Sequence, residues 1–246
     1  MASTTETGHA KNVANFREII TIIKSFGAKY QPISDSIKIE NLENMANQAE
    51  QVLLKLKEAE TLYKQVNAAL QGLFKNMNPL VTQIMGLLSS SDAKASSIEE
   101  ARNIAKLITG ANAKKKKTEE NSAENTEAKN TRSVSRQSYD SRLDNFEKLV
   151  TVLQNISEYK PNEDAFKVSS LQNIVLQMKN AIKENDEKEL IKSQWLEKRN
   201  QILYTPETGL VDISIKIKEY VKGAFGGTKS KEYKDLTKIR IIGLNR

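Results

Sequence analysis

Residues 15–21 read Asn-Phe-Arg-Glu-Ile-Ile-Thr, and residues 145–151 read Asn-Phe-Glu-Lys-Leu-Val-Thr. The second stretch repeats the first 130 positions later, with Asn, Phe and Thr identical. A repeat of this kind fixes the architecture of a chain before any local assignment, because each copy forms the same supersecondary unit. The pair therefore indicates that the chain contains two related units.

The same offset, or one of 129, relates further positions of the two copies. The first copy has Tyr30, Pro32, Asp35, Lys38, Leu42, Asn44, Gln71, Leu73, Leu80 and Val81. The second copy has Tyr159, Pro161, Asp164, Lys167, Leu171, Asn173, Gln201, Leu203, Leu210 and Val211. A register kept over about 100 residues is hard to obtain by chance, and each copy has the usual size of a domain.

Composition divides the chain into four segments. We predict a flexible N-terminus at 1–9, a helical repeat at 10–110, a basic linker at 111–137 and a second repeat at 138–246. The linker carries a run of four lysines: Lys114, Lys115, Lys116 and Lys117. Because it has almost no large apolar side chain to bury, we expect it to be disordered.

Apolar residues recur every three or four positions in both copies, which is the spacing of one helix face. We expect helices over residues 10–29, 35–75, 78–88 and 97–109, and over 139–158, 164–203, 208–221 and 233–242. Asn78 and Thr208 are the expected caps of the third helices. Residues 184–189 are wholly polar, so we expect a solvated stretch, a kink or a break there. The predicted fold class is all-α, with two tandem helical bundles of about four helices each, one of them long, in a pseudo-twofold relation.

A Tyr-x-Pro element, Tyr30-Gln31-Pro32 and Tyr159-Lys160-Pro161, closes the first helix of each copy. Proline disfavours the helical conformation in the residue before it, so the helix should stop there. The favoured interpretation is structural: the ring packs under the turn and the hydroxyl finds a partner. A binding role for the paired tyrosines is the alternative.

The chain lacks the residues that several kinds of reactive site require. The chain has no Cys, and its one histidine, His9, lies in the segment expected to be flexible. The motif Gly226-Gly227-Thr228-Lys229 lacks the spacing of a phosphate-binding loop and is better read as a turn between helices. The acidic pair Glu99-Glu100 suits the first turn of a helix. We therefore expect no catalytic residue, metal, cofactor or small-molecule substrate, and predict that the protein is not an enzyme.

The net charge of +7 bears on partners, because the excess lies in the linker and in residues 213–246. Lys114 to Lys117 are candidate contacts to an anion or a nucleic acid. The linker has no aromatic residue to stack on bases, and acids follow its lysines closely. A solvated linker is therefore the first interpretation, with nucleic acid and an acidic membrane surface as alternatives.

No run of about 18 apolar residues is present, and residues 1–12 lack the apolar core of a secretory signal. We expect a cytoplasmic protein, with leaderless export left open. Residues 79–88 are too short for a membrane-inserting hairpin, so a pore-forming role ranks third.

The stretch 4–16, the Tyr-x-Pro elements, and the segments 138–150 and 204–211 resemble an uncharacterised family of tandem-repeat bacterial helical proteins. The resemblance implies a helical fold and no particular activity. From the residues we predict a non-enzymatic structural or protein-interaction protein that self-associates or docks a protein partner. Nucleic-acid binding through the linker and C-terminus is the alternative, and membrane association is third.

Overall fold

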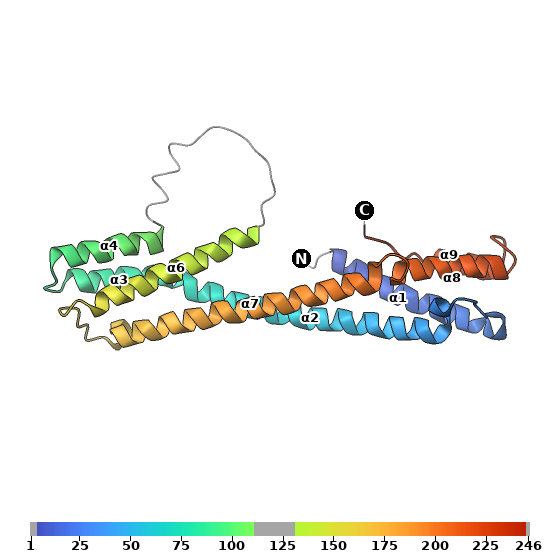
Figure 1. Cartoon of the computed structure of the whole chain (residues 1–246), viewed down its shortest axis with the longest axis horizontal. Coiled ribbons are helices and arrows are strands. Elements are labelled where there is room, and N and C mark those ends of the chain that lie inside the picture. Colours follow the sequence, from blue (N-terminus) through green and yellow to red (C-terminus); the bar gives the residue numbers. More distant parts are fainter. Residues whose placement is uncertain (1–3, 111–130, 245–246) are drawn as a thin grey trace, which may run out of the picture. The chain divides into compact units, whose positions relative to one another are not determined.

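The computed structural model describes residues 4–110 and 131–244 (Figure 1). Within these ranges the chain forms helices and no β-strand, which confirms the predicted all-α class. The first copy forms α1 (Thr4–Ser25), α2 (Ile39–Lys75), α3 (Met77–Ser89) and α4 (Ala95–Thr109). The second copy forms α6 (Thr131–Gln154), α7 (Val168–Tyr204), α8 (Leu210–Ala224) and α9 (Lys231–Lys238). None of the described helices is both long and apolar enough to cross a membrane.

The first helix of each copy starts earlier than its sequence pattern predicts. Helix α1 begins at Thr4 instead of Ala10, and His9 is 2% exposed inside it. Helix α6 begins at Thr131, so residues 131–137 are helical although we assigned them to the linker. The lysine run of the linker lies outside the described residues.

Helix α7 runs without a break through the polar stretch at 184–189, contrary to the kink or break that we allowed for. Glu and Lys dominate that stretch, and both favour helices even where little apolar surface is buried. Like α2, α7 has 37 residues.

The third helices start at different residues from those predicted. Helix α3 is capped by Asn76 and α8 by Gly209, so Asn78 and Thr208 are not the caps. The N–H of Leu80 donates to the Asn76 carbonyl, as that of Ile213 does to Gly209. Structurally equivalent residues of α3 and α8 are therefore 133 positions apart in sequence. The offset is larger than in the preceding helices because extra residues between Tyr204 and α8 form a turn.

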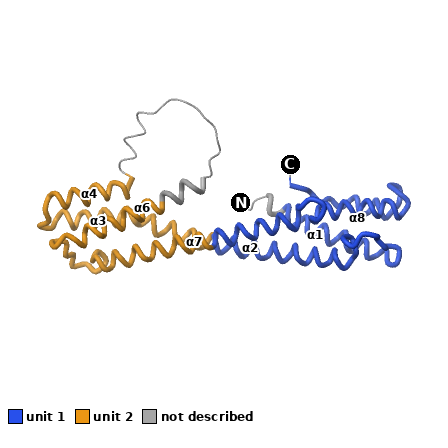
Figure 2. Tube along the Cα trace, in the orientation of Figure 1, with its two compact units in different colours: residues 1–63, 188–246 blue, residues 64–187 orange. Residues whose placement is uncertain are grey.

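The described chain forms two compact units (Figure 2). Unit 1 is residues 1–63 with 188–246, and unit 2 is residues 64–187. The unit boundaries fall inside α2 and α7, whereas the predicted division at 110 and 138 follows the sequence copies. Unit 1 thus combines the start of the first copy with the end of the second.

Each unit has its own apolar core. In unit 1, Phe16 and Leu42 are buried together with Leu210, Ile217 and Leu236. In unit 2, the matching residues of the second copy are buried against α3 and α4, and the set includes Phe146, Leu171, Met77, Ile84 and Ala101. Residues that match in sequence therefore lie at equivalent places in the two cores. The remaining helices of each core come from the other copy.

The tyrosine of the Tyr-x-Pro element has the packing role that we predicted, but the element does not end the first helix, because α1 ends at Ser25 and α6 at Gln154. The hydroxyl of Tyr30 donates to the carbonyl of Ile37 at 2.8 Å, and that of Tyr159 to Phe166 at 3.0 Å. Both rings are 6% exposed. A short 3-10 helix precedes each long helix: η2 (Asp35–Ile37) before α2 and η3 (Asp164–Phe166) before α7. Each tyrosine thus bonds the turn after the first helix to the last residue of this 3-10 helix.

Candidate peptide-binding site on helix α1

The last described residues of the chain lie along α1 in an extended conformation. Helix α9 ends at Lys238, although we predicted that it would continue to Gly243. The segment that follows, Ile239-Arg240-Ile241-Ile242-Gly243, is rich in β-branched residues and glycine, which favour helices least. We call residues 239–244 the C-terminal segment.

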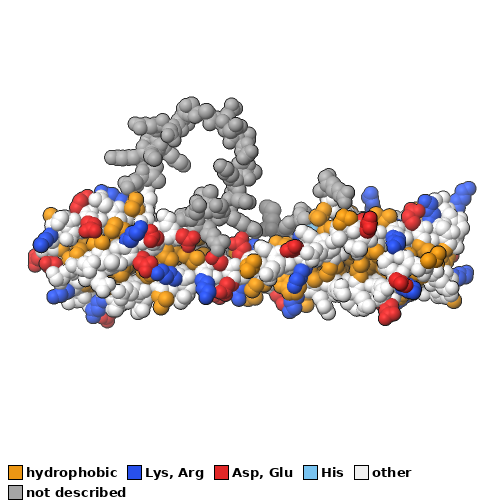
Figure 3. Space-filling view, viewed as in Figure 1, with side chains coloured by type: hydrophobic (Ala, Val, Ile, Leu, Met, Phe, Trp, Pro, Cys, Tyr) orange, Lys and Arg blue, Asp and Glu red, His pale blue; other side chains and the backbone are white. Residues whose placement is uncertain are grey.

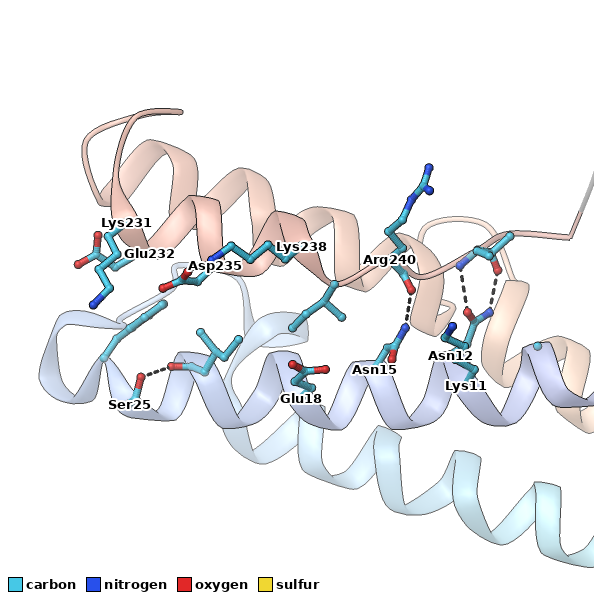
Figure 4. A pocket seen from close by; sticks show the side chains of 15 residues that line it. Lys11, Asn12, Asn15, Glu18, Ser25, Lys231, Glu232, Asp235, Lys238 and Arg240 are labelled. Carbon is cyan, nitrogen blue, oxygen red and sulfur yellow. Dashed lines mark hydrogen bonds and ion pairs between the residues drawn. The ribbon is translucent and has the colours of Figure 1, made fainter.

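Two asparagine side chains of α1 hold the main chain of this segment (Figure 4). The amide of Asn12 donates to the carbonyl of Ile242 at 2.7 Å, and its oxygen accepts from the N–H of the same residue at 3.0 Å. One turn later, Asn15 donates to the carbonyl of Arg240 at 2.6 Å. These bonds involve only main-chain atoms of the segment, so they impose no requirement on the side chains that the segment carries.

Asn12 is held in place by a buried polar network. It is 3% exposed, and its amide nitrogen lies 3.4 Å from the hydroxyl of Tyr204 at the end of α7. That hydroxyl shares a hydrogen bond of 2.5 Å with Nδ1 of His9. Burial, and secondly the charge of Arg199, lower the pKa of His9, so the imidazole is held neutral. The network thus fixes the orientation of the amide.

Helix α8 fixes the start of the segment. Nζ of Lys218 donates to the carbonyl of Ile239 at 2.7 Å, and burial lowers the pKa of that ammonium group. Ile239 itself is 6% exposed, whereas Ile242 is 64% and Leu244 is 45% exposed. The segment is therefore anchored at its start and by its backbone, while its last apolar side chains stay in solvent.

A groove of about 830 Å³ lies between α1 and α9, beside the C-terminal segment (Figure 4). Ile22, Phe26 and Ile239 supply apolar surface to it. Its charged lining residues are Lys11, Glu18, Lys231, Glu232, Asp235, Lys238 and Arg240. The mixture of both signs suits a peptide better than a phosphate, which attracts a uniformly basic site.

Within its described residues, unit 2 shows no corresponding arrangement. Asn145 on α6 matches Asn15 in sequence, yet α4 stays helical as far as Thr109 and packs along α6. Gly110, in the left-handed conformation at φ 74°, closes that helix. Among the residues that the structure describes, the extended segment and its asparagine contacts therefore occur in unit 1.

The basic residues that we predicted as candidate phosphate contacts have a different environment. Lys114 to Lys117 fall outside the described residues. Four C-terminal lysines bind protein groups: Lys216 contacts Ser34 and Ser36, Lys218 contacts Ile239, Lys222 contacts Glu219, and Lys238 contacts Asp235. On the face seen in Figure 3, basic and acidic side chains are interspersed.

The predicted turn at Gly226-Gly227 is present, and both residues have positive φ, 92° and 85°. Among the described residues, no group of three or more His, Asp or Glu side chains is placed to hold a metal ion. Sequence reasoning missed Asn12, Asn15 and Tyr204 as site residues. Polar residues on the face of an amphipathic helix were a usable signal, but nothing in the pattern showed which segment they would meet.

No family model, curated protein or solved structure matches this chain. The resemblance to tandem-repeat bacterial helical proteins is therefore not supported by a match.

Proposed function

We propose that this chain is a non-enzymatic protein-interaction protein whose binding face is the α1 surface around Asn12 and Asn15. The observation that carries the proposal is the pairing of the Asn12 amide with both backbone groups of Ile242. A side-chain amide that pairs in this way substitutes for a neighbouring β-strand, as main-chain groups do when a peptide joins a sheet edge.

Three features support recognition of a protein segment. The buried network of His9 and Tyr204 orients Asn12, which reduces the entropy lost on binding. The adjoining groove offers apolar surface and charges of both signs for side chains of a bound segment. The site is built on a helix, so its groups are more firmly placed than they would be on a loop.

We further propose that the architecture is a tandem duplication whose copies are related by a pseudo-twofold axis. The equal lengths of α2 and α7 support this, as do the matching hydroxyl contacts of Tyr30 and Tyr159. Such a scaffold contains two similar helical units, and the asparagine contacts are described in unit 1.

The test is a peptide titration. A variant that ends at Lys238 leaves α1 uncovered, and a fluorescent peptide of residues 239–246 is added while anisotropy is followed. We expect saturable binding that Asn12→Ala abolishes and Asn145→Ala leaves intact, with circular dichroism confirming that each variant is folded. Equal binding by both variants, or no binding to the folded protein, contradicts the proposal.

The net charge of +7 keeps nucleic-acid binding as the second candidate. Because phosphate contacts release counterions, affinity for DNA or RNA should then fall steeply as salt rises. Replacing Lys114 to Lys117 by glutamine should reduce that slope. Binding that is absent, or indifferent to salt, removes this candidate.

A further inference from the structure

We propose that two copies of this chain exchange their C-terminal arms, so that the arm of each copy occupies the α1 site of the other. The arm is defined as residues 228–244, which comprise α9 and the C-terminal segment. The inference rests on the proposed function and names the partner: a second copy of the same chain.

The arm packs on the rest of unit 1 through a small set of contacts. Its buried apolar side chains are those of Leu236 and Ile239, with Tyr233 and Ile241 partly buried beside them. Its polar contacts include the hydrogen bonds from Asn12 and Asn15 on α1 and from Lys218 on α8. Exchange breaks these contacts and re-forms them on another molecule.

A glycine hinge connects the arm to α8. Gly226 and Gly227 adopt φ of 92° and 85°, and the N–H of Gly227 donates to the carbonyl of Lys222 at 2.8 Å. Positive φ is readily accessible to glycine and disfavoured for other residues. No atom lies within 4 Å of a Cβ built on either glycine, so packing does not lock the turn. The hinge can therefore straighten and direct the arm away from its own α1.

A second copy fits the site better than an unrelated peptide. The arm combines backbone contacts to α1 with the bond from Lys218 to Ile239 and the burial of Leu236. A second copy offers all of these contacts at once, and the exchange is symmetric because each molecule gives and receives one arm. Only the hinge differs between the closed and exchanged forms, so the hinge sets their balance.

The first experiment measures the mass of the full chain by light scattering over a range of concentrations. We expect a dimer whose fraction grows with concentration. Gly226→Ala with Gly227→Ala strains the closed turn and should raise the dimer fraction at a fixed low concentration by about fivefold or more. The control Gly223→Ala changes a helical glycine of α8 with open space around it and should leave the balance unchanged.

A rate measurement on Asn12→Ala separates arm exchange from other association. The closed and exchanged forms make the same Asn12 contacts, so Asn12→Ala should leave the dimer fraction close to that of the unaltered chain but should speed the exchange of subunits between differently labelled dimers, whereas Asn145→Ala on α6 should leave that rate unchanged. A dimer fraction that ignores the hinge change, or subunit exchange that is no faster in Asn12→Ala, overturns the arm exchange. A hinge variant that stays monomeric at every concentration also overturns it.

The absence of Cys from the chain permits a direct test. One full-length variant carries a donor dye on Asn15→Cys and another carries an acceptor dye on Arg240→Cys, two positions joined by a side-chain-to-backbone bond of 2.6 Å. When the two are mixed, energy transfer should appear between chains, and an excess of the unlabelled chain should remove it. Absence of the transfer overturns the exchange. Positive peptide titration beside that result would show that the binding function stands and only the partner is wrong.

Discussion

Glu147 on α6 accepts a hydrogen bond from Nζ of Lys179 on α7 at 2.7 Å, and unit 1 contains the same contact with its charges reversed. There, Arg17 on α1 donates through two nitrogens to Glu50 on α2, each at 2.8 Å. Arg17 matches Glu147 in sequence, and Glu50 matches Lys179. Because the apolar faces of α1 and α6 are alike, the reversed polarity opposes pairing of a first helix with the long helix of the other copy.

Charge reversal in unit 2 tests this coupling. Glu147→Lys places two cations together and should lower the free energy of unfolding, whereas adding Lys179→Glu should restore it. Both side chains are about half exposed, so we expect a coupling of about 0.2–1 kcal/mol from urea unfolding in a double-mutant cycle. Reversal of Lys148 and Asp144, which pair within α6, is the control for general charge effects. A double variant no more stable than the single one contradicts the assignment.

Cleavage between the copies should leave the protein in one piece. A protease site is placed over residues 114–117, and the cut chain is passed through a sizing column. Because unit 1 and unit 2 each contain segments from both fragments, the fragments should co-elute and separate only in denaturant. If each sequence copy formed its own bundle, the fragments would elute separately.

Tyr159 should make stability depend on pH in the alkaline range. Burial, and secondly Glu163, raise the pKa of Tyr159 to about 12. The unfolded chain therefore ionises this hydroxyl first, and the stability that the neutral form provides is lost as pH rises from about 10 towards 12. Tyr159→Phe should be less stable at pH 8 by about 1 kcal/mol, because the Phe166 carbonyl loses its donor, and its stability should fall less between pH 10 and 12. Parallel pH profiles for the two proteins contradict this account.

His9 should make stability depend on pH in the acidic range. Burial and Arg199 lower its pKa, so below about pH 6.5 the unfolded chain binds a proton that the folded chain resists. Stability is therefore full above pH 6.5 and is lost as pH falls through the folded pKa. Since the chain has one histidine, a single imidazole resonance reports the titration directly. We expect a midpoint below 6.5 in the folded protein, and a midpoint at or above 6.5 contradicts the described burial. His9→Gln should flatten the stability profile between pH 7 and 5.

The sequence predicts most of the helices because their apolar residues recur with helical spacing over long stretches. It also predicts the burial of Tyr30 and Tyr159 and a partner for each hydroxyl, whereas the proline stop is wrong in position, because α1 ends at Ser25 and α6 at Gln154. Local sequence signals fail where tertiary contacts determine the residue at which a helix starts or ends. Asn78 has good capping chemistry, yet α3 starts one residue before it because the turn after α2 is so short.

The binding site depends on contacts across more than 200 residues of chain, which periodicity does not reveal. Asn12 lies 230 positions from Ile242, and nothing local distinguishes it from an exposed helical asparagine. The sequence predicts a flexible segment around His9, because nothing in a short polar stretch indicates which surface will cover it. The predicted end of α9 is wrong for the same reason, since the asparagines that stabilise an extended chain there come from α1.

The division of the chain into its two units also dictates an order of events during synthesis. Unit 2 is continuous, so residues 64–187 can all be present while residues 188–246 are still being made. Unit 1 needs residues that precede unit 2 and residues that follow it, so its first segment must wait for its second. The apolar faces of α1 and of the first part of α2 therefore stay without their final partners until residues 188–246 have been made, a period in which a chaperone or a neighbouring nascent chain could cover them.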